Sequence, residues 1–276
     1  MASELLSPSY DTAAPRRRLM DELQDVYRYR DLVRNLVSRN VTARYKRSVL
    51  GVAWTLLDPL LTMAIMAIVF TALFERPIPA FPVFILTSLI AWNLFAQASS
   101  QAIADLTRND ALFGRVYLPR SVFCVATVGS GLVNVCVSLV PLLILMLILG
   151  RPITAAVLFL PVVIVIVALF TVGVGLFMSA FALLFQDVER IYALGLRMLM
   201  YMSGIFYTLD QLPEWLGTAV SLNPTYHMVV LFRTPLYDGA LPSLLNLGYT
   251  SVWAVVAFAV GFWIFARYSD EFVYWS

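Results

Sequence analysis

The sequence contains little charge. Only 13% of its 276 residues are charged, and 61% are hydrophobic. Of the 19 basic and 17 acidic residues, 16 lie within the first 47 positions, so the other 229 residues carry 20 charges. A soluble fold averages about 25% charged residues. The composition therefore excludes an ordinary soluble globule and indicates that lipid surrounds most of the chain. The net charge of +2 is too small to indicate binding to nucleic acid.

Residue types that build catalytic and metal sites are scarce. The chain has one histidine, His227, and one lysine, Lys46. The phosphate-binding loop of nucleotide hydrolases needs a lysine directly after a glycine, whereas Lys46 follows Tyr45. Cys124 and Cys136 fall on different faces of one predicted helix and lack a neighbouring histidine. We expect no catalytic residue, no metal site and no cofactor in this chain.

The N-terminal region is divided into a tail and a basic helix. Residues 1–27 are predicted to form a largely disordered cytoplasmic tail. Within residues 28–47, apolar side chains recur every three to four positions, and basic side chains occupy most of the others. This pattern predicts an amphipathic helix that lies along the membrane surface and does not cross it.

The rest of the chain is predicted to be an all-α, polytopic membrane protein. Residues 48–268 form its transmembrane domain, and residues 269–276 form a cytoplasmic C-terminal tail. Apolar segments long enough to cross a bilayer predict six spans, at about 50–74, 81–101, 120–149, 156–185, 192–209 and 247–267. Between spans five and six, the sparsely charged region 209–246 predicts one or two short, half-inserted outer helices. With six spans, 16 of the 19 basic residues lie on one side, which places both termini in the cytoplasm.

Two sets of residues are candidates for transport. Asp58 is an acidic residue inside a span, where a charge is costly and usually functional. It could instead bond Arg44, Arg47 or a backbone amide near Pro59. Aromatic side chains could stack on sugars in a pore, although packing and interfacial belts also use them. The predicted gate and pore residues are Trp54, Asp58, Phe70, Phe74, Trp92, Tyr201 and Tyr207.

Two cytoplasmic connections are candidates for contact with a partner that supplies energy. Residues 103–113 combine apolar and charged side chains in the pattern of a short amphipathic helix. Charges of both signs also follow the fourth predicted span. Both connections could equally be solvated turns. The predicted coupling residues are Asp105, Arg108, Asp110, Phe113, Arg115, Asp187 and Glu189.

Three stretches of the chain occur in a specific order and spacing. The first runs from Arg30-Asp31-Leu32 through Arg44-Tyr45-Lys46-Arg47-Ser48-Val49-Leu50-Gly51 to Trp54; the second is Phe185-Gln186-Asp187-Val188; the third combines Leu212-Pro213 and Leu222-Asn223-Pro224 with Arg233. Together they make residues 28–268 similar to the membrane subunit of bacterial ABC exporters for O-antigen, capsular polysaccharide and teichoic acid. Gln186 departs from that family, which has a basic residue there.

This resemblance implies a homodimer in the bacterial inner membrane, paired with two copies of a separate ATPase subunit that binds ATP and Mg²⁺. It also implies that a lipid-linked polymer enters from the cytoplasmic leaflet near the basic helix. Basic residues at headgroup depth suit a pyrophosphate on a lipid carrier, and retention of the helix by anionic membrane lipid is the alternative. The predicted headgroup residues are Arg39, Arg44, Lys46 and Arg47.

Other classes of function fit the residues less well. An exporter of a small lipid or drug would have a similar chain pattern. An ion-coupled secondary transporter would have internal repeats and several ionisable residues in mid-membrane, for which Asp58 is the sole candidate. A membrane-embedded transferase would need a cluster of histidine or acidic residues at one interface, and the sequence contains none.

Overall fold

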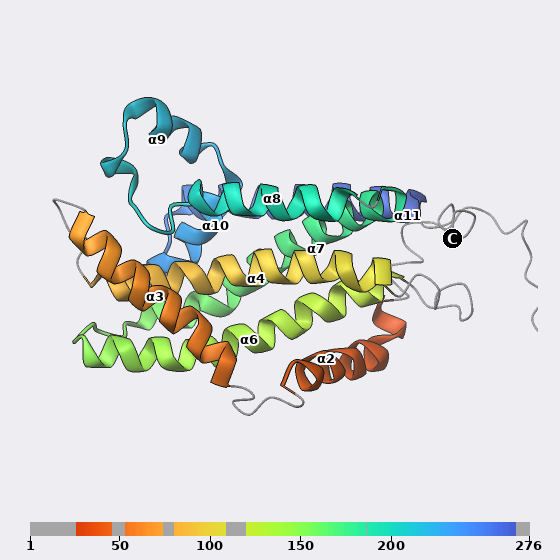
Figure 1. The fold of residues 1–276 in the computed structure, drawn as a ribbon, viewed down its shortest axis with the longest axis horizontal. Coiled ribbons are helices and arrows are strands. Elements are labelled where there is room, and N and C mark those ends of the chain that lie inside the picture. Colours follow the sequence, from red (N-terminus) through yellow and green to blue (C-terminus); the bar gives the residue numbers. More distant parts are fainter. Residues whose placement is uncertain (1–25, 46–52, 74–79, 109–119, 186, 269–276) are drawn as a thin grey trace, which may run out of the picture.

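The computed structural model describes residues 26–45, 53–73, 80–108, 120–185 and 187–268 (Figure 1). In these ranges the chain forms helices and no strand. The longer helices are α2 (Arg30–Tyr45), α3 (Ala53–Leu73), α4 (Phe81–Arg108), α6 (Arg120–Ile148), α7 (Leu160–Leu184), α8 (Asp187–Tyr201) and α11 (Leu244–Tyr268). The shorter ones are η1 (Ala155–Phe159), η2 (Leu209–Gln211), α9 (Glu214–Ser221), α10 (Pro224–Arg233) and η3 (Thr234–Asp238).

Four helical stretches are long and apolar enough to cross a bilayer. They are Phe81–Arg108, Arg120–Ile148, Ala155–Leu184 and Leu244–Arg267. The prediction of an all-α, polytopic membrane protein is therefore confirmed. The other two predicted spans correspond to α3 and α8. The apolar part of α3, Leu56–Val69, and the 15-residue α8 are both shorter than the four helices above. A total of six spans therefore stays a prediction.

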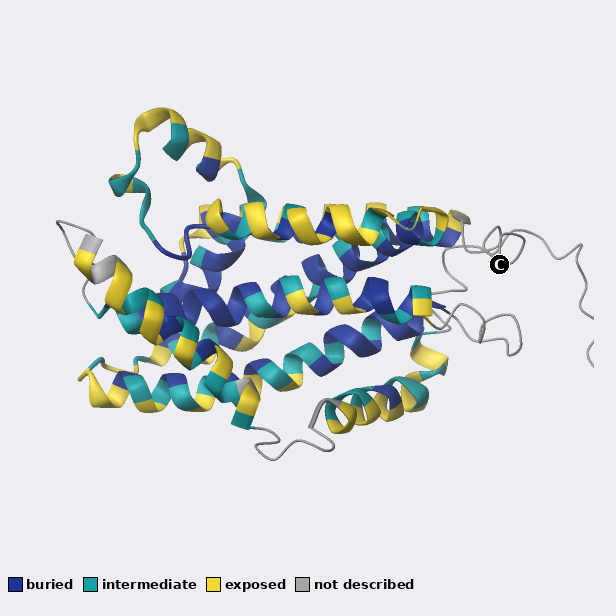
Figure 2. Cartoon of the chain, in the orientation of Figure 1, coloured by how far each residue is buried: buried dark blue, intermediate teal, exposed yellow. Residues whose placement is uncertain are grey.

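The bundle is built around α4, which passes through its middle (Figure 2). One side of α4 packs on α6 and α7, and further contacts come from α3, α8 and α10. Large side chains of α4, including Phe84, Phe95 and Ile103, are fully buried. The apolar sequence of α4 is therefore covered mainly by protein, whereas α6, α7 and α11 leave many apolar side chains exposed, as lipid-facing helices do.

The closest approach of two helices lies between α7 and α11. A Cβ atom added at Gly261 would overlap the backbone carbonyl of Gly173, and one added at Gly173 would overlap the backbone of Ala257 and Phe258. Glycines at these positions let the two backbones touch. Such small-residue contacts are a common way for helices to associate in a membrane, where lipid is as apolar as the side chains.

Two predicted boundaries are wrong. The fifth apolar segment, predicted at 192–209, is the helix Asp187–Tyr201, because Gly204 takes a left-handed conformation (φ 64°) and the following apolar residues are buried in a turn. A separate helix at 103–113 does not begin at Ile103, since residues 103–108 are the last turns of α4. There Ile103 and Leu106 continue its buried face. Residues 109–113 lie outside the described part of the chain.

Short helices do form between α8 and α11, as predicted. Helix α10 is buried in the bundle, whereas α9 projects from it and is largely exposed (Figures 1 and 2). Arg233 at the end of α10 is buried, donates a hydrogen bond of 2.9 Å from Nη1 to the Gly204 carbonyl, and lies over the Phe84 ring at 4.0 Å. His227 has Nδ1 2.8 Å from Asn246 Oδ1 and Nε2 2.7 Å from the Ser221 carbonyl. These contacts attach the region between α8 and α11 to α4, to the turn that follows α8, and to α11.

The N-terminal helix α2 lies against α6. Leu36 on its inner face is buried, and Val37 packs close to Gly129, where an added Cβ would lie 3.0 Å from Val37 Cγ2. Arg34 and Arg39 of the same helix are exposed. That this helix lies at the membrane surface stays a prediction.

Candidate functional site

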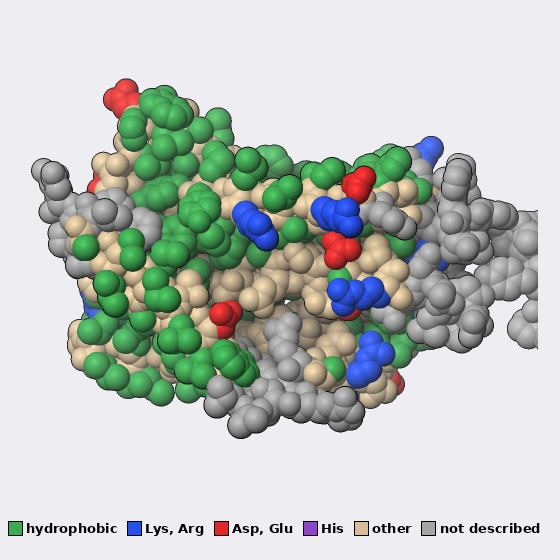
Figure 3. Space-filling model, in the orientation of Figure 1, with side chains coloured by type: hydrophobic (Ala, Val, Ile, Leu, Met, Phe, Trp, Pro, Cys, Tyr) green, Lys and Arg blue, Asp and Glu red, His purple; other side chains and the backbone are tan. Residues whose placement is uncertain are grey.

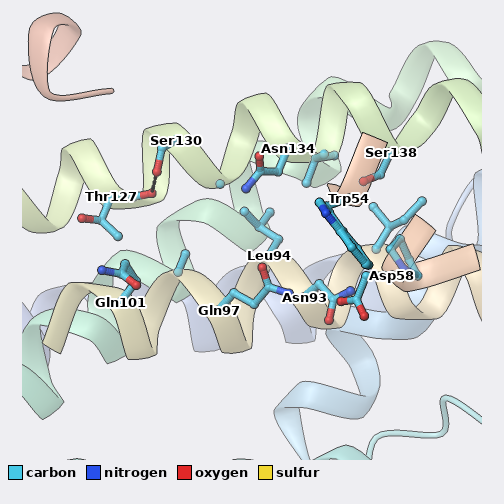
Figure 4. A pocket seen from close by; sticks show the side chains of 15 residues that line it. Trp54, Asp58, Asn93, Leu94, Gln97, Gln101, Thr127, Ser130, Asn134 and Ser138 are labelled. Atoms are coloured by element: carbon cyan, nitrogen blue, oxygen red, sulfur yellow. Dashed lines mark hydrogen bonds between the residues drawn. The ribbon is translucent and has the colours of Figure 1, made fainter. Parts of the chain in front are cut away.

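A polar groove opens between α4 and α6, with the first turns of α3 at its rim (Figure 4). It encloses a cavity of about 340 Å³. Figure 3 shows the corresponding hollow in the middle of this face, bordered in part by tan atoms, which are backbone and side chains that are neither hydrophobic nor charged. The described residues that line the cavity are Trp54, Asp58, Pro59, Ile90, Asn93, Leu94, Gln97, Ala98, Gln101, Thr127, Ser130, Gly131, Asn134, Val135 and Ser138.

Regular spacing places the polar side chains of α4 on the groove. Asn93, Gln97 and Gln101 are each four residues apart, which puts the three carboxamides on one face of the helix, one turn above the other. The opposite face of α4 carries the aromatic side chains that fill the bundle core, such as Phe84 and Phe95. Packing of that apolar face therefore fixes the carboxamides toward the groove.

Helix α6 supplies the facing wall. Its polar residues are spaced by three or four positions and therefore share one face: Thr127, Ser130, Asn134 and Ser138. The adjoining face of α6 receives α2. The face of α6 that forms the groove wall and the face of α6 that contacts α2 are thus adjacent.

At one end of the groove, a hydrogen bond to Asp105 joins the two walls. Gln101 Nε2 donates to Asp105 Oδ1 at 2.7 Å, and Thr127 Oγ1 donates to Asp105 Oδ2 at 2.7 Å. Both carboxylate oxygens of Asp105 are therefore engaged by residues that line the groove. Since Thr127 belongs to α6 and the other two to α4, this carboxylate ties the helices together.

Substitution of Asp105 by Ala is expected to lower the free energy of unfolding by about 2 kcal/mol, because two donors lose a charged acceptor. The midpoint of thermal unfolding of the detergent-solubilised protein measures this loss. Asp187→Ala is the matched control: Asp187 Oδ1 lies 4.0 Å from Arg190 Nη1 in an exposed ion pair, which contributes at most ~1 kcal/mol. Equal losses of stability in the two variants would contradict the inference that Asp105 stabilises the contact between α4 and α6.

The structure brings two of the predicted gate residues, Trp54 and Asp58, together on the groove. They lie one helical turn apart on α3, and the indole of Trp54 is 52% exposed. Trp92 is not a pore residue: it is 4% exposed and packs edge-on against Phe95 in the core, because it lies on the face of α4 opposite to the carboxamides.

Of the remaining predicted gate residues, Tyr201 and Tyr207 do not line the groove. Tyr201 and Tyr207 lie at the end of α8 and in the following turn, where Tyr207 Oη donates to the Tyr201 carbonyl at 2.6 Å. The Phe70 side chain and Phe74 lie outside the described residues.

The predicted headgroup and coupling residues are only partly described. Arg39 is exposed on α2, whereas the side chain of Arg44, and Lys46 and Arg47 altogether, lie outside the described residues. The same is true of Asp110, Phe113 and Arg115. Arg108 ends α4 and is exposed, and Asp187 and Glu189 are exposed in the first turn of α8. Asp105 is half-buried against α6 and is not free to contact a partner in the way predicted.

Sequence reasoning missed most of the lining of the groove. When hydropathy is averaged over a window, α4 and α6 both score as apolar spans. The average conceals the amides and hydroxyls that are scattered along these helices. The signal that could have found them is the interval of four between Asn93, Gln97 and Gln101 within an apolar segment. Polar side chains repeated on one face of a spanning helix indicate a surface that does not face lipid.

Most polar side chains that line the groove are uncharged groups that can donate or accept hydrogen bonds. Among the described residues, no group of histidine, cysteine or acidic side chains could hold a metal ion. Its lining instead combines carboxamides, hydroxyls, one indole and one carboxylate. A helical, multi-pass membrane protein with a polar groove between spanning helices belongs to the class of transport proteins.

Comparison with known proteins defines the family. Residues 31–237 match the family described as ABC-2 type transporter. The match covers most of the chain, including α2, the groove and the buried α10. This chain belongs to the ABC-2 type transporter family of membrane proteins.

Its curated relatives are permease proteins of polysaccharide export. The O-antigen export system permease protein RfbA of Klebsiella pneumoniae is 28% identical over 246 residues, covering 88% of this chain and 93% of that protein. RfbA of Myxococcus xanthus is 27% identical over 252 residues, covering 91% and 97%. The polysialic acid transport protein KpsM of Escherichia coli is 24% identical over 234 residues, covering 83% and 90%.

Proposed function

We propose that this chain is the transmembrane subunit of an ATP-driven exporter that moves a lipid-linked polysaccharide or teichoic-acid-type polymer across the bacterial inner membrane. The observation that carries the proposal is the polar groove between α4 and α6 in a member of the ABC-2 family. Export of O-antigen and of polysialic acid by its relatives points to a sugar polymer. Carboxamides and an exposed indole suit sugars, which offer hydroxyls for hydrogen bonds and apolar ring faces for stacking.

A second copy of the chain completes the groove in this proposal. Asp58, Gln97 and Gln101 are exposed in the single chain and line the groove. Polar groups at membrane depth are unfavourable against lipid and must face protein or a water-filled path. A homodimer with the two grooves facing each other would enclose such a path and leave the apolar surfaces of α7 and α11 toward lipid.

Energy comes from a partner in this proposal. Two copies of a separate ATPase subunit bind ATP and Mg²⁺ and contact the cytoplasmic ends of the helices. The end of α4, the starts of α6 and α8, and the end of α11 gather at one end of the bundle (Figure 1), where Arg108, Arg120, Arg190 and Arg267 lie. The positive-inside rule supports a cytoplasmic location for this end and for both termini. Arg108, Asp187 and Glu189 are the described candidates for contact with the ATPase, and Asp110, Phe113 and Arg115 are candidates from the sequence alone.

The test is restoration of polymer at the cell surface in a strain that lacks its own permease. Expression of this chain with the ATPase encoded beside it is expected to restore surface polymer, measured by immunoblotting of whole cells. Expression of either subunit alone is expected to fail. Full export by this chain without any ATPase would refute the proposal and favour an ion-coupled transporter.

The cytoplasmic entrance is proposed to lie beside α2, where Arg39, Arg44, Lys46 and Arg47 hold the pyrophosphate of the lipid carrier and anionic lipid. Exchanging Arg44, Lys46 and Arg47 for Gln is expected to lower export about tenfold or more, because each basic side chain near the surface contributes ~1 kcal/mol toward an anionic headgroup. Insertion and dimerisation should be unchanged, as measured by crosslinking in membranes.

The control for this variant removes the same charge elsewhere. Arg16, Arg17 and Arg18 lie in the N-terminal tail, and their joint exchange for Gln should leave export intact. Unchanged export in the helix variant would mean that the basic residues only anchor the chain to lipid.

A further inference from the structure

The groove has a definite electrostatic character. Among the described residues that line it, one is acidic, Asp58, and none is basic. A second carboxylate, Asp105, lies directly behind Gln101 and Thr127 at one end, with both oxygens bonded to them. The described lining therefore carries one charge, which is negative and belongs to Asp58 at the rim.

The hydroxyl groups of the groove add to this character. Thr127 Oγ1 lies 2.7 Å from Asp105 Oδ2 and 2.9 Å from the Phe123 carbonyl, so its one proton is directed at a protein acceptor. Ser130 Oγ donates to the Thr127 carbonyl at 2.7 Å. Gln101 directs one of its two amide protons at Asp105. These three side chains consequently offer mainly oxygen lone pairs to a cargo.

A lining of this kind accepts some chemical groups and opposes others. Lone pairs beside carboxylates attract hydroxyl and amide N–H donors. They repel carboxylates and phosphates, which bring like charge and no proton. In a space that excludes bulk water, this repulsion is stronger than at an open surface. Asn93 and Gln97 present both donors and acceptors, which suits the paired roles of sugar hydroxyls.

We propose that the α4–α6 groove selects a glycan with no carboxylate or phosphate in its repeating unit. This inference rests on the proposed function and narrows it. The charged end of the cargo is the lipid pyrophosphate. Its proposed site is the basic region of α2, and α2 packs on a face of α6 next to the face that forms the groove wall. In this proposal, recognition of the anionic end is separate from passage of the uncharged polymer. A relative that carries polysialic acid, as its name states, would need a different balance of charge along the same path.

The experiment uses inverted membrane vesicles that contain the full chain and its ATPase. Two labelled probes share one polyprenyl diphosphate carrier and one chain length: a polymer of neutral hexoses and a polymer of sialic acid. ATP-dependent movement into the lumen protects each probe from an added degrading enzyme. The neutral probe is expected to be protected at least about tenfold faster than the acidic one, a ratio that corresponds to about 1.4 kcal/mol, because like charges beside the Asp58 carboxylate repel.

Variants link this preference to the groove. Asp58→Asn should narrow the ratio of the two rates roughly threefold, since removal of the carboxylate weakens repulsion of the acidic probe. Glu214→Gln removes the same charge from exposed α9, far from the lining, and should leave the ratio unchanged. Equal rates for the two probes would overturn the selection while leaving the export function intact. Failure of both probes would overturn the export function, and the selection with it.

Discussion

Replacing Gln97 by Trp is expected to abolish export of the polymer. Gln97 lies at the middle of the carboxamide row on α4, is exposed to the groove and faces the polar wall of α6. An indole there would occupy much of a cavity of about 340 Å³ and remove a hydrogen-bonding group. We expect surface polymer to fall by at least about a hundredfold, measured by whole-cell immunoblotting, because no alternative polar path through α4 and α6 would remain.

Ile144→Trp provides the matched control. Ile144 lies on α6, does not line the groove and is 53% exposed, so an indole there should meet lipid and leave export unchanged. Both variants must be present in the membrane in equal amounts, which a tag at the C-terminus would measure. Normal export by the Gln97 variant would show that cargo does not pass along this groove.

Replacing Gly261 by Ala is expected to destabilise the folded protein by about 3 kcal/mol or more. The new methyl group would overlap the backbone carbonyl of Gly173, and backbone at a helix contact cannot move aside as a flexible side chain can. The two helices α7 and α11 would have to separate along their closest contact. A large fall in the yield of monodisperse protein and in the midpoint of thermal unfolding would measure the effect.

Gly248 provides the control within the same helix. Both glycines belong to α11, but a Cβ atom added at Gly248 meets nothing within 4 Å. Gly248→Ala should leave stability unchanged or raise it slightly, since Ala favours a helix over Gly by up to about 1 kcal/mol. If the two substitutions had equal effects, the backbone contact between α7 and α11 would not be a main source of stability.

The predicted helix boundaries agree with the structure where the length of an apolar segment determines them. The predicted segments at 120–149 and 247–267 correspond closely to α6 and α11, because a spanning helix needs about 20 apolar residues whatever its neighbours are. The segment at 192–209 failed, because Gly204 ends the regular backbone while the apolar pattern continues past it. Hydropathy records burial and does not distinguish a helix from a buried turn.

The candidate site was predicted only in part, for a similar reason. Asp58 was identified because a carboxylate is conspicuous inside an apolar segment, and Trp54 because aromatic side chains can stack on sugars. Trp92 was wrongly placed in the pore, because the sequence does not give the rotation of α4 within the bundle. That rotation buries Trp92 beside Phe95 and turns Asn93 and Gln97 to the groove.

The sequence by itself determined that this chain is a helical membrane protein, because the number and length of apolar segments are local properties of the chain. Only the tertiary structure decided that Gln101 and Asp105 of α4 meet Thr127 of α6, and that the polar faces of both helices form one groove. The physical reason is that the cost of a polar group in a membrane depends on what faces it. That neighbour comes from another helix, so its identity is fixed only when the helices pack.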